Sequence, residues 1–87
     1  MEYTFKDMLN DLKNGREIEF DYKEQHYSIV NGNGKWCYCA DKQSTELCNF
    51  EEKKRLIGKV KKLIVQNETM ENVINKKLYA KGTLYVL

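Results

Sequence analysis

Proline is absent from this sequence, and only five of its 87 residues are glycine. Flexible linkers and disordered segments are usually rich in these residues, so their scarcity argues against a loosely ordered chain. The composition, 41% hydrophobic and 32% charged, is typical of a globular protein. A chain of this length can bury one small core, and we therefore expect a single domain over residues 1–87.

Long apolar runs are also absent. No stretch approaches the roughly 18 consecutive apolar residues of a membrane-spanning helix. The opening segment MEYTFKDMLNDLK carries acidic residues in an amphipathic pattern, which is unlike a signal peptide. These observations predict a cytoplasmic protein without a membrane partner.

Residues that bind metals or carry redox chemistry are few, with three cysteines and one histidine. The cysteine count is odd, and two of the cysteines are separated by a single residue. This pattern does not fit the disulfide framework of a small secreted domain. We therefore expect reduced thiols and no cofactor.

The first periodic segment predicts a helix with one apolar face. Thr4 is a suitable N-cap, Asp7 stands in the capping-box position, and Gly15 offers a left-handed stop. The apolar residues between them recur at i, i+3, i+4 and i+7, which is the spacing of one helix face. They are Phe5, Met8, Leu9 and Leu12.

The apolar period then changes from 3.6 to 2 in the segments EIEFDY, HYSIV, KWCYCA and TELC, which predicts strands. Two-residue turns at Glu24-Gln25, Gly32-Asn33 and Lys42-Gln43 would bring the aromatic and aliphatic side chains to one face. Moving the second turn to Asn33-Gly34 shifts the pairing by two residues without exchanging the faces. The side chains predicted on this face are Ile18, Phe20, Tyr22, Tyr27, Ile29, Trp36, Tyr38, Ala40 and Leu47.

Two helices are predicted after the strands. One runs from Phe50, or from the residue before it, to Ile64; the next is capped by Asn67 or Thr69 and ends at Gly82. The fold class is therefore α+β: an N-terminal helix, a three- to four-stranded antiparallel meander and two C-terminal helices, with TLYVL as a short terminal strand or an extended tail. Which sheet face the C-terminal helices cover stays open.

A candidate metal site lies on the sheet face opposite the aromatic one. The predicted turns place His26, Cys37, Cys39 and Cys48 there, with Cys37 opposite Cys48 and His26 near Cys39. These are zinc-type ligands, but Cys-x-Cys on a strand holds its sulfurs about 6–7 Å apart, whereas structural zinc sites use turns of the Cys-x₂₋₄-Cys type. We favour small packed residues as the interpretation, with a zinc- or thiol-dependent domain as a third possibility for function.

Catalysis would need more than these residues supply. His26 could act as a base for Cys39, but no acid is clearly placed to orient its ring, and the sequence has no glycine-rich nucleophile turn. We therefore expect a protein that is not an enzyme.

Charge is distributed unevenly along the chain. Residues 1–49 carry six basic and nine acidic side chains, whereas residues 50–87 carry nine basic and four acidic ones. Such polarity can steer a charged partner, or it can simply bring the two halves of the chain together.

The acidic residues of one predicted strand form a row, Glu17, Glu19 and Asp21. Carboxylates at this spacing could bind a divalent cation or a basic partner. We favour a simpler interpretation, in which they solvate an edge strand and discourage aggregation.

A basic cluster lies on the second predicted helix, away from its apolar stripe. Nucleic-acid phosphates would be the functional ligand of such a face, and a solvated helix surface is the simpler alternative. No helix-turn-helix, zinc-finger or aromatic RNA-recognition motif accompanies the cluster. Its members are Lys54, Arg55, Lys59, Lys61 and Lys62.

The run FKDMLNDLKNGREIEFDYKEQHYSI, followed by a tryptophan strand, resembles the small uncharacterised proteins of phages and prophages of low-GC Gram-positive bacteria. The resemblance covers roughly residues 1–40 and consists of a short amphipathic helix, a glycine and an alternating strand with Ile18, Phe20 and Tyr22. It implies an accessory protein that binds another macromolecule, as phage inhibitors of host defence do. It implies no catalytic residues.

These observations together predict a small non-catalytic binding module, with an unknown protein as the favoured partner. A nucleic-acid-binding accessory protein that uses the basic face of the second helix is the alternative. We expect a monomer or a homodimer, since an edge strand or the apolar end TLYVL could pair with a second copy.

Overall fold

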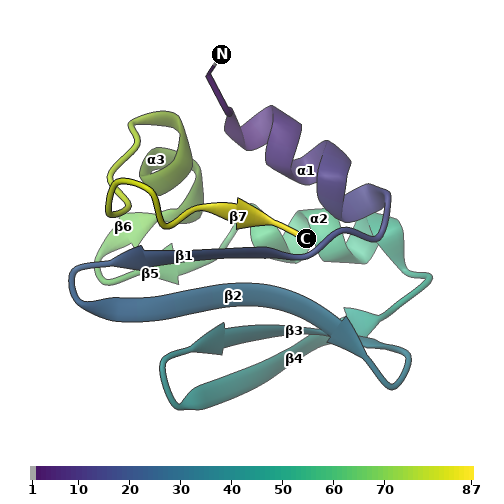
Figure 1. The fold of residues 1–87 in the computed structure, drawn as a ribbon. Helices are drawn as coiled ribbons and strands as arrows, with labels where there is room; N and C mark the ends of the chain where they lie inside the picture. Colours follow the sequence, from purple (N-terminus) through teal and green to yellow (C-terminus); the bar gives the residue numbers. More distant parts are fainter. Residues whose placement is uncertain (1) are drawn as a thin grey trace.

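The computed structural model describes residues 2–87, which form two layers with the helices on one side of an antiparallel sheet (Figure 1). The helices are α1 (Phe5–Lys13), α2 (Lys53–Val60) and α3 (Met70–Asn75). The strands are β1 (Ile18–Tyr22), β2 (Gln25–Gly32), β3 (Lys35–Ala40), β4 (Gln43–Asn49), β5 (Ile64–Val65), β6 (Glu68–Thr69) and β7 (Tyr85–Val86). The predicted α+β class, the meander and the terminal strand are confirmed.

The main sheet has the strand order β4-β3-β2-β1-β7. Strands β1 to β4 form the meander, and β7 returns from the end of the chain to pair with β1 at Ile18 and Glu19. The prediction of β1 as an edge strand is therefore wrong, because β1 lies between β2 and β7. The long exposed edge is β4, and β5 and β6 form a separate small hairpin.

All three helices pack on the aromatic face of the sheet, which answers the question of where the C-terminal helices lie. Trp36 and Phe20 on this face are almost completely buried, and α1, α2 and α3 each contribute side chains to the same cluster. The helices thus supply the cover that an amphipathic sheet needs. None of the helices formed by residues 2–87 lies on the opposite face (Figure 1).

The two ends of α1 follow the sequence closely. The backbone N–H of Asp7 donates to Oγ1 of Thr4 at 3.1 Å, and the backbone N–H of Thr4 donates to Oδ2 of Asp7 at 3.0 Å. This reciprocal pair is the capping box that the sequence predicts. Beyond the helix, Gly15 has a φ of +84°, the conformation of a left-handed stop.

The hairpins preserve the predicted faces but not every predicted turn. Strands β1 and β2 turn at Lys23 and Glu24, so that Asp21 pairs with His26. This pairing is shifted by two residues from the prediction. Strands β2 and β3 turn at Asn33 and Gly34, the alternative that the sequence left open.

Strand β4 contains the one irregularity of the meander. Its turn lies at Asp41 and Lys42 rather than one residue later. Cys37 pairs with Glu46, whereas Trp36 pairs with Cys48, so Leu47 is an extra residue in a β-bulge. Because one extra residue reverses which side chains face the core, the bulge turns Cys48 inward.

The C-terminal helices are shorter than predicted. Helix α2 ends at Val60, and the chain then forms the β5-β6 hairpin, whose turn has positive φ at Gln66 and Asn67. The expectation of a helix extending to Ile64 is wrong, and that side chain is 57% exposed. Helix α3 has the predicted cap, since Oγ1 of Thr69 accepts from the Asn72 backbone, but it ends at Asn75. No helix of residues 2–87 is long and apolar enough to cross a membrane.

Candidate binding surfaces

The uncovered sheet face carries a cluster of two carboxylates and the histidine. Nδ1 of His26 lies 2.6 Å from Oδ1 of Asp21, and Nε2 lies 3.7 Å from Oε2 of Glu19. The expectation that no acid orients this imidazole is therefore wrong. The acid was missed because the predicted turn placed Asp21 opposite Ser28 instead of His26.

The cysteines are not gathered into one site. Cys39 pairs with Ser28 across the strands, and its thiol donates to Oγ of Ser44 at 3.7 Å. The hydrogen-bond partner of His26 is the Asp21 carboxylate, not this thiol. Cys37 lies on the same face, opposite Glu46 instead of Cys48. The predicted grouping of thiols around the histidine is wrong because it depended on both turn positions and on a regular β4.

Cys48 belongs to the core, where it is 5% exposed beneath α2. Burial, followed by the nearby Glu52 carboxylate, raises the pKa of this thiol. A thiol in such a setting is a poor nucleophile and a poor metal ligand at neutral pH. Within residues 2–87, no three or more His, Cys, Asp or Glu side chains are placed to hold a metal ion.

The three residues of the acidic row make polar contacts within the chain. Oε2 of Glu17 accepts a hydrogen bond from the backbone N–H of Asn31 at 2.8 Å. Glu19 and Asp21 flank His26, as described above. All three predicted acidic candidates thus contact other groups of the same chain, and we assign them a structural role first.

The basic cluster is distributed over α2 and the turn that follows it. Lys54, Arg55 and Lys59 lie on the helix, while Lys61 and Lys62 follow its last residue. All five are exposed. Of these five residues, only Arg55 forms an ion pair within residues 2–87, at 3.4 Å from Glu52. The four lysines are therefore not neutralised by the fold.

A groove of about 420 Å³ separates α1 from α2 and adjoins this basic cluster. Its apolar part is Leu9 and Ile57, which are both half-buried. Three lysines border it, and the Asp7 carboxylate that caps α1 lies at one side. The lining residues are Lys6, Asp7, Leu9, Asn10, Lys13, Ile57 and Lys61.

The lysines of α1 were not singled out from the sequence. Lys6 and Lys13 flank Leu9 at helical spacing, and that spacing was the available signal. Their importance depends on α2 lying beside α1, which the periodicity of either helix alone does not specify.

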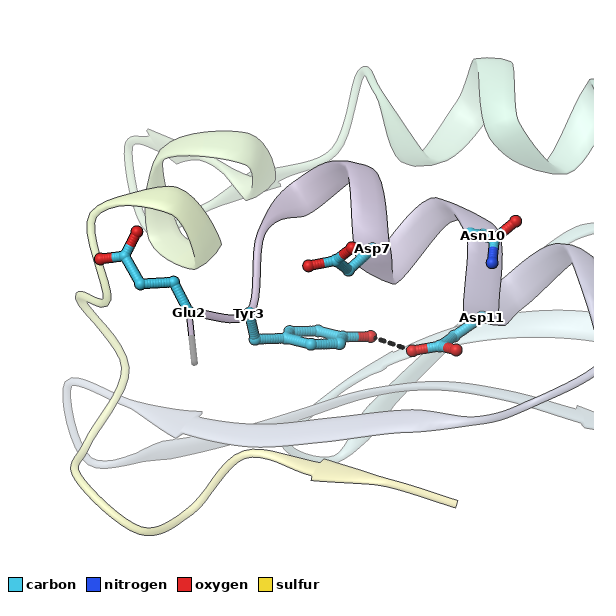
Figure 2. Close-up of a pocket in the computed structure, with 5 residues that line it drawn as sticks. All are labelled: Glu2, Tyr3, Asp7, Asn10 and Asp11. Atoms are coloured by element: carbon cyan, nitrogen blue, oxygen red, sulfur yellow. Dashed lines mark hydrogen bonds between the residues drawn. The ribbon is translucent and has the colours of Figure 1, made fainter.

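Another hollow, of about 340 Å³, lies beside the start of α1 (Figure 2). Tyr3 lies across it, and its hydroxyl donates to Oδ2 of Asp11 at 2.6 Å. Burial and this hydrogen bond raise the pKa of Tyr3 well above its ordinary value. We assign these residues a structural role, because the hydrogen bond from Tyr3 to Asp11 holds the segment before α1 against the helix.

Comparison with known proteins gave no match among protein families, curated proteins or solved structures.

Proposed function

We propose that this chain is a small non-catalytic binding module that contacts a partner protein through the surface of its helical layer. The observation that supports the proposal most is the contrast between its two charged candidates. The acidic row is engaged by hydrogen bonds and by His26, whereas Lys54, Lys59, Lys61 and Lys62 form no ion pair within residues 2–87. Lysines that form no ion pair within the chain can pair with acidic groups of a partner.

A protein suits this surface better than a polyanion alone would. The groove beside the lysines exposes parts of Leu9 and Ile57, and a protein interface typically combines an apolar centre with a charged rim. The uncovered sheet face, with Glu19 and Asp21, is unfavourable for nucleic acid.

The resemblance to phage and prophage proteins adds a setting to this proposal. A small accessory protein of that kind would act on a bacterial host system in the cytoplasm. The three free cysteines suit a reducing compartment.

Nucleic acid is the second candidate partner because of the far side of α2. Arg55 and Lys59 are four residues apart on α2, so by helical geometry they lie on one side of the helix, and neither lines the groove. Retention of duplex or single-stranded oligonucleotides on a filter at ~50 mM salt, falling steeply as salt is added, would favour this candidate. Absence of retention under that condition would exclude it.

The main experiment is affinity capture from a nuclease-treated bacterial lysate, with quantification of the bound proteins. We compare the natural chain with a double reversal, Lys54→Glu and Lys61→Glu. The matched control is Lys42→Glu with Lys81→Glu, which makes the same charge change at exposed positions outside the cluster. We expect a specific protein that is lost with the first pair and kept with the second.

Two results would contradict the proposal. In one, nuclease treatment removes everything that the natural chain captures. In the other, both double variants retain the captured protein equally well. Circular dichroism of all three chains establishes that each is folded before capture.

A further inference from the structure

Helices α1 and α2, which the groove separates, carry the same pattern of residues in their sequences. On α1 the residues at i, i+3, i+4 and i+7 are Lys6, Leu9, Asn10 and Lys13, and all four line the groove. The set at the same spacing in α2 and its C-cap is Lys54, Ile57, Gly58 and Lys61, of which Ile57 and Lys61 line the groove. Each stripe therefore has an apolar side chain in the middle and a lysine at each end.

The two stripes together make a site with a simple layout. Leu9 and Ile57 form a half-buried apolar centre, and Lys6, Lys13 and Lys61 line the groove beside it. A fourth exposed lysine, Lys54, lies three residues before Ile57 on α2. None of these lysines forms an ion pair with another residue of the described chain, 2–87. The carboxylate of Asp7 is already used at the groove's edge as the cap of α1, where it accepts from Thr4. Of the described residues that line the groove, Asp7 alone is acidic, whereas three are lysines.

Gly58 provides a second, independent observation. It lies inside α2, its φ is not positive, and an added Cβ would meet no atom within 4 Å. Neither backbone conformation nor packing within this chain requires glycine here. Glycine in a helix interior costs about 1 kcal/mol relative to alanine. Gly58 does not line the groove itself, but it is exposed on α2 directly after Ile57, which does. Glycine at an exposed helix position lets another backbone approach closely, so Gly58 suits a partner helix that lies over the groove and against α2.

We propose that the groove between α1 and α2 binds an acidic amphipathic helix of a partner protein. Apolar side chains of that helix would fill the space between Leu9 and Ile57, and its flanking carboxylates would face the four lysines. Gly58 would give its backbone close approach to α2. A helix lying in a groove between two helices is a common mode of peptide recognition, and it uses residues at i, i+3, i+4 and i+7. This inference rests on the proposed function and specifies the partner's chemistry.

The test uses two synthetic peptides of 15 residues with identical composition. One places leucines on a single helix face and glutamates beside them, and the other has the same residues in scrambled order. Fluorescence anisotropy at ~0.15 M salt measures their binding to the full chain. We expect the amphipathic peptide to bind about tenfold more tightly than the scrambled one. Equal binding would overturn the inference, because it would indicate attraction by charge alone.

Variants of Gly58 separate binding from folding. Gly58→Ala is expected to raise the stability of the chain while weakening peptide binding, and Gly58→Leu is expected to weaken binding about tenfold or more. Opposite changes in stability and affinity cannot result from partial unfolding. Lys81→Leu adds an apolar side chain at an exposed position outside the groove and is expected to leave binding unchanged. Unaltered affinity in both Gly58 variants would overturn the inference.

Two further comparisons complete the design. Ile57→Asp, which places a carboxylate at the apolar centre, is expected to abolish binding of the amphipathic peptide. A duplex oligonucleotide that displaces the peptide more effectively than unlabelled peptide does would assign the surface to nucleic acid and overturn the inference. If a protein is captured from lysate but does not depend on Ile57 or Gly58, the groove is excluded while the proposed function stands. If no protein is captured, the proposed function itself fails.

Discussion

At the scale of single residues, the three thiols differ because of where the bulge in β4 places them. Cys37 and Cys39 are half-buried on the uncovered sheet face, while Cys48 is buried under α2. Burial and Glu52 raise the pKa of Cys48, and the thiolate is the form that reacts. We expect Ellman's reagent to modify two thiols of the native chain quickly and the third only when urea unfolds it.

The Cys48→Ala variant is the control for that assignment. It should retain the two fast reactions and lose the slow one. A slow reaction that persists without Cys48 would contradict the placement of this side chain in the core.

Tyr38 predicts a loss of stability at alkaline pH. Burial, followed by the neighbouring Tyr27, raises its pKa from 10.0 to about 12. A pKa raised in the folded state means that ionisation favours the unfolded chain. The contribution of the neutral Tyr38 phenol to the free energy of unfolding is therefore complete below pH 10 and is lost as the pH rises from 10 toward 12. Urea midpoints measured across this range should fall, and they should fall less in Tyr38→Phe.

Tyr3 contributes in the same direction, because burial and the Asp11 carboxylate also raise its pKa. The Tyr38→Phe chain should therefore keep part of the alkaline loss. A midpoint profile identical to that of the natural chain would show that Tyr38 does not ionise with unfolding in this range.

At the scale of elements, the turn between β1 and β2 is an unfavourable one for its residues. Lys23 and Glu24 have φ of +48° and +66°, the conformation that a type I′ hairpin turn requires at both of its central residues and that glycine adopts most easily. Glu24→Gly should therefore raise the free energy of unfolding, by roughly 0.5–1 kcal/mol. Urea denaturation measures this change.

The β3-β4 turn offers a matched control. Lys42 stands at the second position of that turn without a positive φ, so glycine there relieves no strain. Lys42→Gly should lower the stability slightly, because it only adds freedom to the unfolded chain. If both substitutions destabilise the protein equally, the left-handed conformation of Glu24 is not a source of strain.

The elements also indicate what could be predicted from the sequence. The cap and stop of α1 depend on neighbouring residues, and so does the alternation of apolar residues in β1 to β3. These features were predicted correctly. The bulge at Leu47 and the end of α2 at Val60 depend on packing between distant segments. The periodic run from Leu56 to Ile64 looked like a longer helix because a two-residue hairpin leaves little trace in a pattern.

The candidate site was predictable only in part for the same reason. The sequence identified the lysines of α2, since they lie together along the chain. It did not identify the groove, because Leu9 and Ile57 become neighbours only when both helices cover the same sheet face. The pair of His26 and Asp21 was missed through a turn misplaced by one position.

At the scale of the whole molecule, the uneven charge of the sequence becomes a difference between surfaces. The helical layer carries Lys54, Lys59, Lys61 and Lys62, which form no ion pair within residues 2–87, while the uncovered sheet face carries Glu19 and Asp21 around His26. Stacking two uncovered sheet faces would bring carboxylates close to each other in many orientations. If a homodimer forms, the edge strand β4 is therefore a more favourable contact than the sheet face.

The end of the chain predicts both the stability and the association state of the molecule. Strand β7 covers the edge of β1, and Leu84 and Val86 pack against the core. Deletion of residues 84–87 should cost about 2–3 kcal/mol, the value for two half-buried aliphatic side chains, and it should expose β1 as a new edge. Urea denaturation should record the loss, and sedimentation should detect larger species than for the intact chain.

Leu87→Ala is the control, because that side chain is 64% exposed and should change stability by less than about 0.5 kcal/mol. A deleted chain with the stability and sedimentation of the natural one would mean that β7 is not part of the folded sheet.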